Sequence, residues 1–499
     1  MGRIPRKNVL FILADQFRAD CLGAAGNPII RTPNLDALAA EGVLFEKCFC
    51  QTNPCGPSRM CIFTSRYLCS TRALTNETPL VDAEENLAMH LQAGGYNPGL
   101  IGYNDYVQDP RILPHGHPQK TVPCYDNVLP GFDWVLFHDE DASREYIEWL
   151  RAKEYPEEIL DCRRIQAPNV PPAGPGEHLA LHYPARYRAE DSEASFVTET
   201  AIRYIDLRRN RGWALSLNYI KPHPPRICPA PYHEMYNPAQ MPPASRRREE
   251  LGDPHPYFRL MHAEPRLECE RDLRETQANY HGMITELDDC LGRLFDYLKR
   301  SGQWENTLIV FSADHGEMLG DHYLLDKAHF YDGTMRVPLI LRDPSPEADS
   351  ARGARFDRFA ETIDIAPTIL EFLDLQVPDR FQGRSLLGQV RNDPEACVRR
   401  EIHFEFDFRN LVPPENDWDP NECLLWVIRD DRYKYVQFGL ESLPPLLFDL
   451  QEDPSEFNNL AKSPAHAAAV AECAQRMLRW RMRNEDQRME HWAARHRRP

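Results

Sequence analysis

Before residue 385, continuous apolar runs alternate with amphipathic stretches along the chain. The run NVLFILA at 8–14 is short and rich in branched residues, which is typical of a buried strand. The stretch TPNLDALAAEG at 32–42 predicts a short helix, with Asn34 as its N-cap and Gly42 at its end. Strands that alternate with helices predict an α/β fold with a large, mostly parallel sheet flanked by helices. Further strands are predicted at 97–103, 213–219, 306–314 and 336–343, and further helices at 86–96, 192–209, 270–300 and 362–375.

The pattern changes at about residue 385, where short strand-like runs follow one another without long helices between them. We therefore expect a catalytic α/β domain over 1–384 and a smaller C-terminal subdomain over 385–499. Inside the first domain, 107–190 is rich in proline, glycine, histidine and charge, so we expect long insertions there, near the mouth of a site. The subdomain is predicted as an antiparallel sheet of strands at 400–408, 423–430, 433–439 and 446–450, closed by a helix at 464–484.

The charge balance narrows the possible partners, because 58 lysines and arginines face 76 aspartates and glutamates, a net charge of −18. An acidic chain repels phosphates overall, so we expect neither nucleic acid nor a membrane as a partner. The apolar run near the N-terminus stops at Asp15 and is too short for a secretory signal, and no run is long enough to cross a bilayer. We therefore expect a cytoplasmic protein whose 14 cysteines are buried thiols rather than disulfides.

Five of these cysteines fall in one short segment, which raises the question of a metal knot, a disulfide patch or one special cysteine. No pair among them has the C-x2-C spacing, and no nearby histidine completes a zinc set. A structural zinc site is therefore disfavoured, while the other two interpretations stay open. The five positions are Cys48, Cys50, Cys55, Cys61 and Cys69.

Two predicted strands end in pairs of potential metal ligands, Asp15-Gln16 and Asp314-His315. Ligands of open α/β sheets bind beyond the carboxyl ends of the strands. One strand-end aspartate is as often a helix cap as a ligand, but two such pairs on one sheet favour a shared divalent cation. Oxygen ligands with a single imidazole suit Mn²⁺ or Ca²⁺ better than a thiolate zinc site.

Two further side chains follow predicted strands and can act on an anionic ligand. Lys327 lies beyond the second pair and can fold back to an anion held on the metal, although most lysines are simply solvated. His223 stands between prolines in YIKPHPPR at 219–226, and the prolines would hold its imidazole in place. A histidine fixed at a strand end can serve as a general acid, and it can equally be an ordinary loop residue.

The run CGPSR at 55–59 matches the Cys-x-Pro-Ser-Arg signature of the type I sulfatases, in the alkaline phosphatase superfamily. The chain also resembles that family in the N-terminal aspartate, in the 32–42 helix and in SADHGEMLGDH at 312–322. The resemblance extends to LFDLQEDPSEFNNLA at 447–461, and so covers nearly the whole chain. The two ligand pairs and KPHPP make it most similar to the branch that holds the phosphonate monoester hydrolases and their arylsulfatase relatives.

This resemblance implies that a maturation enzyme oxidises Cys55 to Cα-formylglycine, whose hydrate would be the nucleophile and a fifth metal ligand. Arg59 would hold the formylglycine and its charge, while His223 and Lys327 would contact the substrate oxygens and assist the leaving group. The substrate would be a small anionic ester, and the chain would form a homodimer or homotetramer, as relatives of this kind often do. Residues implied to line the anion pocket are Asn76 and Tyr103.

Two departures from the phosphonate monoester hydrolases favour sulfate esters. In those enzymes the strand that corresponds to 97–103 ends in Gly-Tyr-Thr-Thr-Thr, whereas this chain has Asn104 and Asp105 after Tyr103. Those enzymes also often carry alanine at the position of Ser58, which is the sulfatase form. Asp105 can be a solvated loop residue or can face the substrate. In the second case its carboxylate would cost a dianionic phosphate monoester about 4 kcal/mol, at about 4 Å and an effective dielectric of about 20. We therefore expect an arylsulfatase-type hydrolase of sulfate monoesters. The alternatives are a phosphonate monoester hydrolase or phosphodiesterase with the same site and, remotely, a catalytically silent metal-binding relative.

Overall fold

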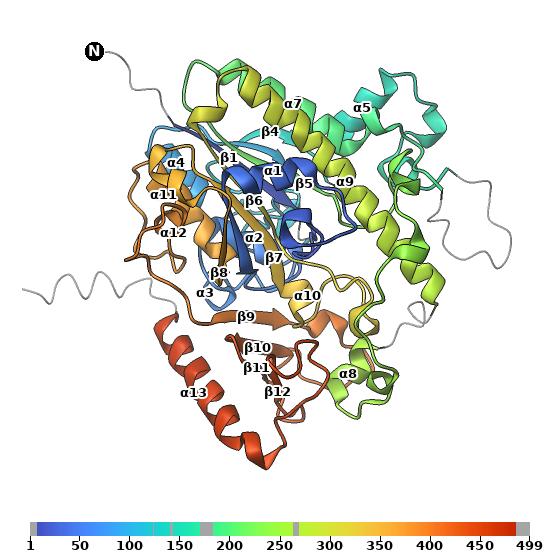
Figure 1. Cartoon of the computed structure of the whole chain (residues 1–499), viewed down its shortest axis with the longest axis vertical. Helices are drawn as coiled ribbons and strands as arrows, with labels where there is room; N and C mark the ends of the chain where they lie inside the picture. The colour runs from blue at the N-terminus through green and yellow to red at the C-terminus, as the bar shows by residue number, and fades with distance from the viewer. Residues whose placement is uncertain (1–6, 123, 140–142, 170–182, 263–268, 486–499) are drawn as a thin grey trace, which may run out of the picture.

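One eight-stranded sheet forms the centre of the molecule in a computed structural model that describes residues 7–122, 124–139, 143–169, 183–262 and 269–485 (Figure 1). The strand order is β4-β3-β5-β1-β6-β7-β2-β8, and only β7 runs antiparallel to its neighbours. The predicted large, mostly parallel sheet is thereby confirmed. The strands are β1 (Asn8–Ala14), β2 (Val43–Phe49), β3 (Gly99–Gly102), β4 (Asp133–Phe137), β5 (Ala214–Tyr219), β6 (Thr307–Ala313), β7 (Arg336–Arg342) and β8 (Ala354–Glu361).

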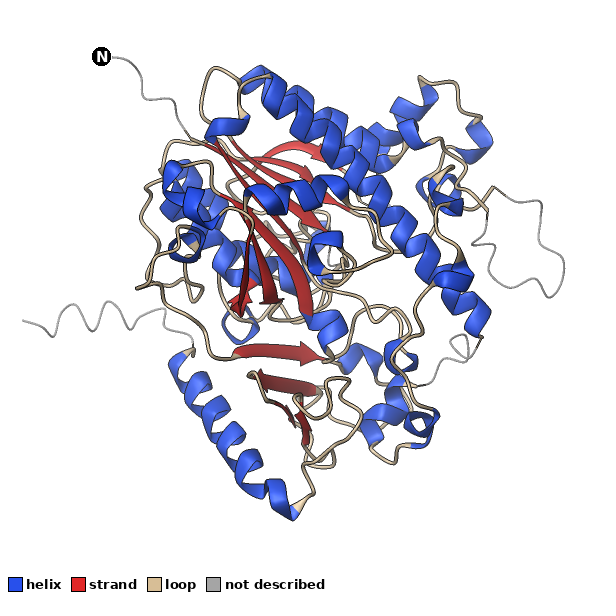
Figure 2. Ribbon diagram, in the orientation of Figure 1, coloured by secondary structure: helices blue, strands red, loops and turns tan. Residues whose placement is uncertain are grey.

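Helices flank this sheet in two groups, which lie to either side of the strands in Figure 2. The long helices α7 (Glu193–Arg208) and α9 (Glu270–Arg300) pack against each other, and α1 (Pro33–Glu41) packs on α9. The second group consists of α2 (Cys55–Thr64), α4 (Leu87–Ala93) and α11 (Ile365–Phe372), which contact one another. The shorter helices are α3 (Leu68–Thr71), α5 (Arg144–Arg151), α6 (Cys162–Ile165), α8 (Pro256–Met261), α10 (Asp332–Met335) and α12 (Leu387–Val390).

The start of α1 differs from the sequence prediction by two residues. Thr32 is the N-cap and Pro33 the first helical residue, whereas Asn34 lies inside the first turn. Proline suits this position because its fixed φ matches the helix and it has no N–H to leave unpaired. Instead of capping α1, the Asn34 side chain donates to Asp288 on α9, so it ties the two helices together.

The strands that the sequence analysis does not predict include both edges of the sheet. Strand β8 is exposed over most of its first five residues and has no continuous apolar run, while β4 has only the short apolar run 134–137 and buries a single side chain. Edge strands face solvent on more sides than central strands, which weakens the hydrophobic signal. Strand β4 lies within 107–190, so this part of the expected insertions belongs to the sheet, while 170–182 lies outside the described residues.

A second, four-stranded antiparallel sheet follows in the chain and lies at one end of the first (Figure 1), as predicted. Helix α13 (Ala467–Arg483) closes it, and Cys473 and Met477 of this helix pack on Ile428 and Tyr435 of the sheet. None of the described helices has the length and apolar character needed to span a membrane. The strands, in the spatial order β12-β11-β10-β9, are β9 (Ile402–Asp407), β10 (Leu424–Arg429), β11 (Tyr433–Phe438) and β12 (Leu446–Asp449).

Four adjacent parallel strands, β3, β5, β1 and β6, end at the same edge of the large sheet. Their carboxyl ends therefore deliver the segments 103–105, 220–223, 15–16 and 314–315 to one place. In open α/β sheets this edge is where ligands bind. The fold thus brings together most of the residues that the sequence analysis selected.

Candidate active site

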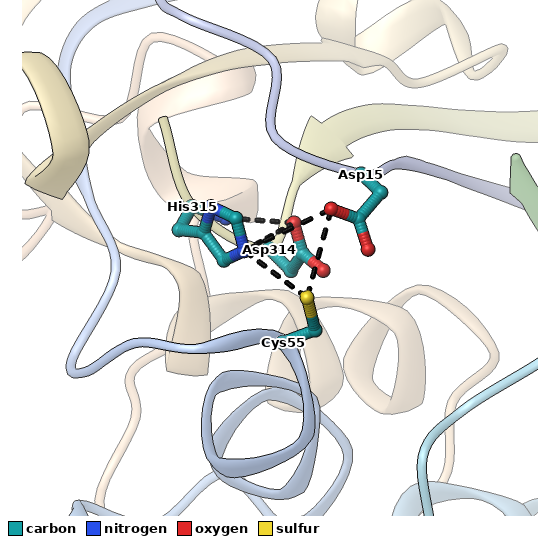
Figure 3. A group of neighbouring side chains, drawn as sticks. All are labelled: Asp15, Cys55, Asp314 and His315. Carbon is teal, nitrogen blue, oxygen red and sulfur yellow. Dashed lines mark hydrogen bonds and ion pairs between the residues drawn. The ribbon is translucent and has the colours of Figure 1, made fainter. Parts of the chain in front are cut away.

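Four buried side chains form a compact cluster at this edge (Figure 3). Asp15 follows β1, Asp314 and His315 follow β6, and Cys55 is the first residue of α2. One ligand atom from each, a carboxylate oxygen, an imidazole nitrogen or the thiol sulfur, lies within 4.8 Å of the others. Burial and the neighbouring Asp15 carboxylate raise the pKa of Asp314 to about 6, so a cation between the two carboxylates would relieve their repulsion.

Gln16, the fifth predicted ligand, has a backbone in the left-handed region with φ of 63°. Its N–H donates to Asp314 Oδ1 at 3.1 Å, which places the residue directly beside the cluster. Its amide nitrogen Nε2 donates to Glu317 and Asp326, but no donor among the described residues reaches the buried Oε1 atom. A buried amide oxygen without a partner is costly unless a cation or water binds it. Two carboxylates, one amide oxygen and one imidazole fit a hard divalent cation such as Mn²⁺ or Ca²⁺.

Arg59 lies one helical turn after Cys55 and is completely buried. Its guanidinium donates to Asp15 Oδ2 at 3.1 Å and to Asp314 Oδ2 at 2.9 Å. It also lies 3.6 Å from Asp105 Oδ2 and donates to the Tyr103 carbonyl oxygen at 2.9 Å. Arg59 therefore holds both aspartates of the cluster in place. Among the described residues, it is the only side-chain cation that contacts the carboxylates of Asp15, Asp105 and Asp314 together.

Lys327 approaches the cluster from the loop after β6, and its Nζ donates to Cys55 Sγ at 3.0 Å. Burial alone would lower the pKa of Lys327, but the facing Cys55 and Asp15 raise it, so the ammonium stays charged. The Cys55 thiol is itself held neutral, because burial and Asp15 raise its pKa well above the usual value. The unmodified thiol is thus a poor nucleophile, since only a thiolate attacks readily.

The three residues expected in the anion pocket also lie around Cys55. Tyr103 donates its hydroxyl to Asp15 Oδ2 at 2.5 Å, and Asn76 accepts the Gly56 N–H at 3.1 Å. Asp105 is buried and paired with Arg59, so it is not the solvated loop residue that its sequence context allows. A Cβ atom on Gly56 would lie 3.3 Å from the Asp105 Cβ, so the start of α2 packs closely under this residue.

Ser58, one of the two departures that favour sulfate esters, is completely buried. Its hydroxyl donates to the Asp314 carbonyl oxygen at 2.6 Å. Ser58 therefore supports the backbone of a predicted metal ligand, and its hydroxyl is engaged there.

His223 lies near the cluster on the segment that follows β5. A turn fixes its backbone, because its N–H donates to the Ile220 carbonyl at 2.9 Å, and its Nδ1 lies 2.8 Å from the Pro224 carbonyl oxygen. Burial raises the pKa of Asp15, but Lys327, His223 and Arg59 together bring it well below the usual value. The half-buried His223 ring is therefore close enough to act electrostatically on the cluster.

The other cysteines of the 48–69 segment behave as buried thiols. Burial raises the pKa of Cys48, Cys50 and Cys61, and none of them joins a metal-ligating group among the described residues. All 14 cysteines of the chain are free. Cys55 is thus distinguished from the rest by its position inside the cluster.

A cavity of about 640 Å³ lies next to Lys327. Its walls are mainly apolar and include Ile227, Leu260 and Leu411, while Arg226 and Asp326 contribute charge. A space of this size beside the lysine can hold a small organic ligand.

Arg226 and Asp326 are the neighbours of the site that sequence analysis missed. Arg226 ends the segment YIKPHPPR and donates to Glu317 and Asp326. The Gln16 amide nitrogen donates to the same two carboxylates. In the sequence, only their places beside His223 and Lys327 pointed to these two residues. Nothing pointed to their pairing, because they lie 100 positions apart.

A family model described as "Sulfatase" matches residues 7–375, which is most of the chain. The chain belongs to the sulfatase family. A second model, described as "N-sulphoglucosamine sulphohydrolase, C-terminal", matches residues 320–483 and so covers the second sheet and α13. The signature at 55–59 thus stands within a chain that the two models together match from residue 7 to residue 483.

Individual relatives come from both branches suggested by the sequence. The chain is 39% identical to the multifunctional alkaline phosphatase superfamily protein PehA of Trinickia caryophylli, over 98% of this chain and 97% of that protein. It is 27% identical to an arylsulfatase of Clostridium perfringens, over 93% and 92% of the two chains. Among solved structures, the phosphonate monoester hydrolase of Agrobacterium radiobacter superposes with a TM-score of 0.89 at 36% identity, with 97% of each chain covered.

Proposed function

We propose that this member of the sulfatase family hydrolyses sulfate monoesters with a nucleophile derived from Cys55. Phosphonate monoesters and phosphodiesters are the second candidate substrates of the same site. The observation that carries the proposal is the position of Cys55 Sγ, which lies 3.7 Å from Asp15 Oδ1, 3.3 Å from His315 Nε2 and 3.0 Å from Lys327 Nζ. A reactive oxygen in this place would face both the metal ligands and a fixed cation.

The proposal includes conversion of Cys55 to Cα-formylglycine by a maturation enzyme, because the buried thiol itself is held neutral. The hydrated aldehyde would supply one hydroxyl that attacks the ester and displaces the alcohol. Deprotonation of the second hydroxyl would then expel sulfate or phosphonate by C–O cleavage and regenerate the aldehyde. A divalent cation, Mn²⁺ or Ca²⁺, held by Asp15, Gln16, Asp314 and His315 would lower the pKa of that hydrate and polarise the ester.

The remaining residues have distinct parts in this scheme. Lys327 would offset negative charge that builds on the non-bridging oxygens during attack. Arg59 would keep Asp15 and Asp314 oriented, since it donates to both. His223 would donate a proton to the leaving oxygen, and Asn76 and Tyr103 would line the pocket beside Gly56 and Asp15.

The second candidate is favoured by the relatives, because a phosphonate monoester hydrolase matches the chain at 36% identity and an arylsulfatase at 27%. The Asp105 carboxylate does not argue strongly against phosphorus esters, since Arg59 compensates part of its charge at 3.6 Å. Sulfate and phosphonate monoesters are both monoanions, and one set of residues can therefore bind both. We therefore infer that a single site hydrolyses both sulfate and phosphonate monoesters.

The setting of the reaction is part of the same proposal. Fourteen free cysteines accord with a reducing compartment, which supports a cytoplasmic enzyme. The chain is also proposed to act as a homodimer or homotetramer. A catalytically silent metal-binding relative would have the same ligands but an unconverted Cys55.

Two measurements test the proposal. The intact mass of the peptide that contains Cys55, from protein made in a host with the maturation enzyme, should show formylglycine; an unmodified thiol there would reject the nucleophile. Values of kcat/KM are then compared for 4-nitrophenyl sulfate, 4-nitrophenyl phenylphosphonate and bis(4-nitrophenyl) phosphate, which share one leaving group. A phosphonate value that exceeds the sulfate value by orders of magnitude would make the second candidate the main activity.

Replacing His223 by alanine should slow the esters of poor leaving groups much more than those of good ones. A general acid contributes roughly 10²–10⁴-fold when the leaving oxygen needs its proton and little when it does not. The measurement is kcat/KM across a series of substituted phenyl esters. His90→Ala on α4 is the control, because it removes a half-buried histidine outside the site. Equal losses across the series would count against proton donation by His223.

A further inference from the structure

An ionic network, buried at Glu317 and half-exposed at Asp326, lies next to the metal-ligand cluster and contacts it through Gln16. The Gln16 Nε2 atom donates to Glu317 Oε2 at 2.5 Å and to Asp326 Oδ1 at 3.1 Å. The same two oxygens accept hydrogen bonds from Arg226 Nη2, at 2.7 and 2.5 Å. Each carboxylate oxygen therefore receives one donor from the arginine and one from the glutamine.

This arrangement fixes which end of the Gln16 amide faces the cluster. An ionised carboxylate only accepts hydrogen bonds, so only the amide nitrogen, and not the oxygen, can face Glu317 and Asp326. The amide oxygen must then point away from the network, and it is the buried atom that no donor among the described residues reaches. The orientation of the amide follows from the charges around it.

Glu317 is itself held in one orientation. Its second oxygen, Oε1, accepts the backbone N–H groups of Leu319 and Asp326, at 2.9 and 2.6 Å. Its side chain is fully buried, and Arg226 supplies the compensating charge. An isolated carboxylate in this position would pay a large desolvation penalty, which the Arg226 guanidinium offsets at 2.7 Å.

We propose that Glu317, Asp326 and Arg226 are positioning residues that present the Gln16 oxygen to the divalent cation. This inference rests on the proposed function, because it assumes that a cation binds at the cluster. The network also joins three elements of the site. Arg226 ends the segment that carries His223, Asp326 precedes Lys327, and Glu317 follows the ligand pair after β6. Hydrogen bonds therefore connect Gln16 to the two segments that carry His223 and Lys327.

The Glu317→Gln variant tests the orientation directly. The two backbone N–H groups at Oε1 oblige the new side chain to keep its oxygen there, so its NH₂ group must replace Oε2. That NH₂ group faces the NH₂ group of Gln16 and Arg226 Nη2, so donors meet where Oε2 accepted from both. The Gln16 amide regains a hydrogen bond to residue 317 only if it turns over, with loss of the bond that its nitrogen donates to Asp326 Oδ1. The turned amide offers nitrogen in place of oxygen and cannot bind a cation. We expect Mn²⁺ affinity, measured by calorimetric titration with Mn²⁺ alone, to fall by roughly 10–100-fold.

Glu361→Gln is the matched control, because Glu361 is equally buried, pairs with Arg399 and accepts a backbone N–H from His403. Glu361 contacts none of the predicted metal ligands, so the Mn²⁺ affinity of the Glu361→Gln protein should remain within a few-fold of wild type. Asp326→Asn provides a second variant at a half-exposed side chain, which is well suited to tolerate the change, and should weaken Mn²⁺ binding in the same direction.

The outcomes separate the two proposals. Folded Glu317→Gln and Asp326→Asn proteins that bind Mn²⁺ as tightly as wild type would overturn the positioning role and leave the proposed function intact. A wild-type chain that binds neither Mn²⁺ nor Ca²⁺ would instead overturn the metal part of the proposed function, and this inference with it. Selective weakening in the two network variants, with the Glu361→Gln control unchanged, supports the positioning role.

Discussion

Cys55→Ala should reduce turnover of every ester to background, a loss of roughly 10⁵–10⁶-fold in kcat, while the fold is retained. Alanine removes the atom from which the nucleophile is made, and the Oδ2 atoms of Asp15 and Asp314 are already bonded to Arg59. The measurement is kcat on the sulfate and the phosphonate ester, with circular dichroism to show that the protein folds. Substantial remaining activity would mean that a different group attacks the ester.

Cys61→Ala is the matched control for this variant. Cys61 lies in the same helix, is completely buried and takes no part in the cluster, so turnover should be preserved. Cys55→Ser adds a further distinction, because a serine oxygen can attack once but has no second hydroxyl with which to expel the product. That variant should release one equivalent of leaving group and then carry the transferred group covalently. Sustained turnover by Cys55→Ser would reject the two-hydroxyl scheme.

Arg59→Met should have the largest effect on stability among single substitutions in the site. The change leaves Asp15, Asp105 and Asp314 buried without their shared cation, and breaking a buried ion pair by removing one partner costs about 3–5 kcal/mol. Methionine retains much of the apolar volume, so the loss reports mainly on charge. The free energy of unfolding is measured by urea denaturation without added metal.

Arg151→Met on α5 is the control, because this arginine also pairs with two carboxylates, Glu148 and Glu157, but at the surface. Surface pairs contribute little, so the urea midpoint should hardly move. If Arg59→Met shifted the midpoint no more than Arg151→Met, the three carboxylates near Arg59 would have to be protonated in the wild-type protein.

The gathering of Asp15, Asp314 and His315 could be predicted because it needs only a local pattern and a general rule. Each pair directly follows a long apolar run, and parallel strands deliver their carboxyl ends to one edge. The structure makes β1 and β6 direct neighbours, which brings the pairs together. Strand adjacency was the part that the sequence pattern did not specify.

The ionic partners of the site could not be predicted in the same way. Arg226 and Asp326 lie 100 positions apart, and nothing in the local sequence of either residue indicates the other. The pairing of Asp105 with Arg59 likewise depends on how the end of β3 packs over α2. Long-range charge pairing is a property of tertiary packing, while the strands and long helices follow from short-range periodicity.

Helix α2 also sets an order of events for the proposed maturation. All ten of its residues are buried, and Cys55 itself is 5% exposed. A modifying enzyme must draw the segment around the cysteine into its own active site, and that requires an extended, accessible chain. Oxidation of Cys55 would therefore have to precede closure of the fold around α2. The fraction of active enzyme would then depend on the rate of modification relative to the rate of folding, because a folded chain would no longer present Cys55 to the modifying enzyme.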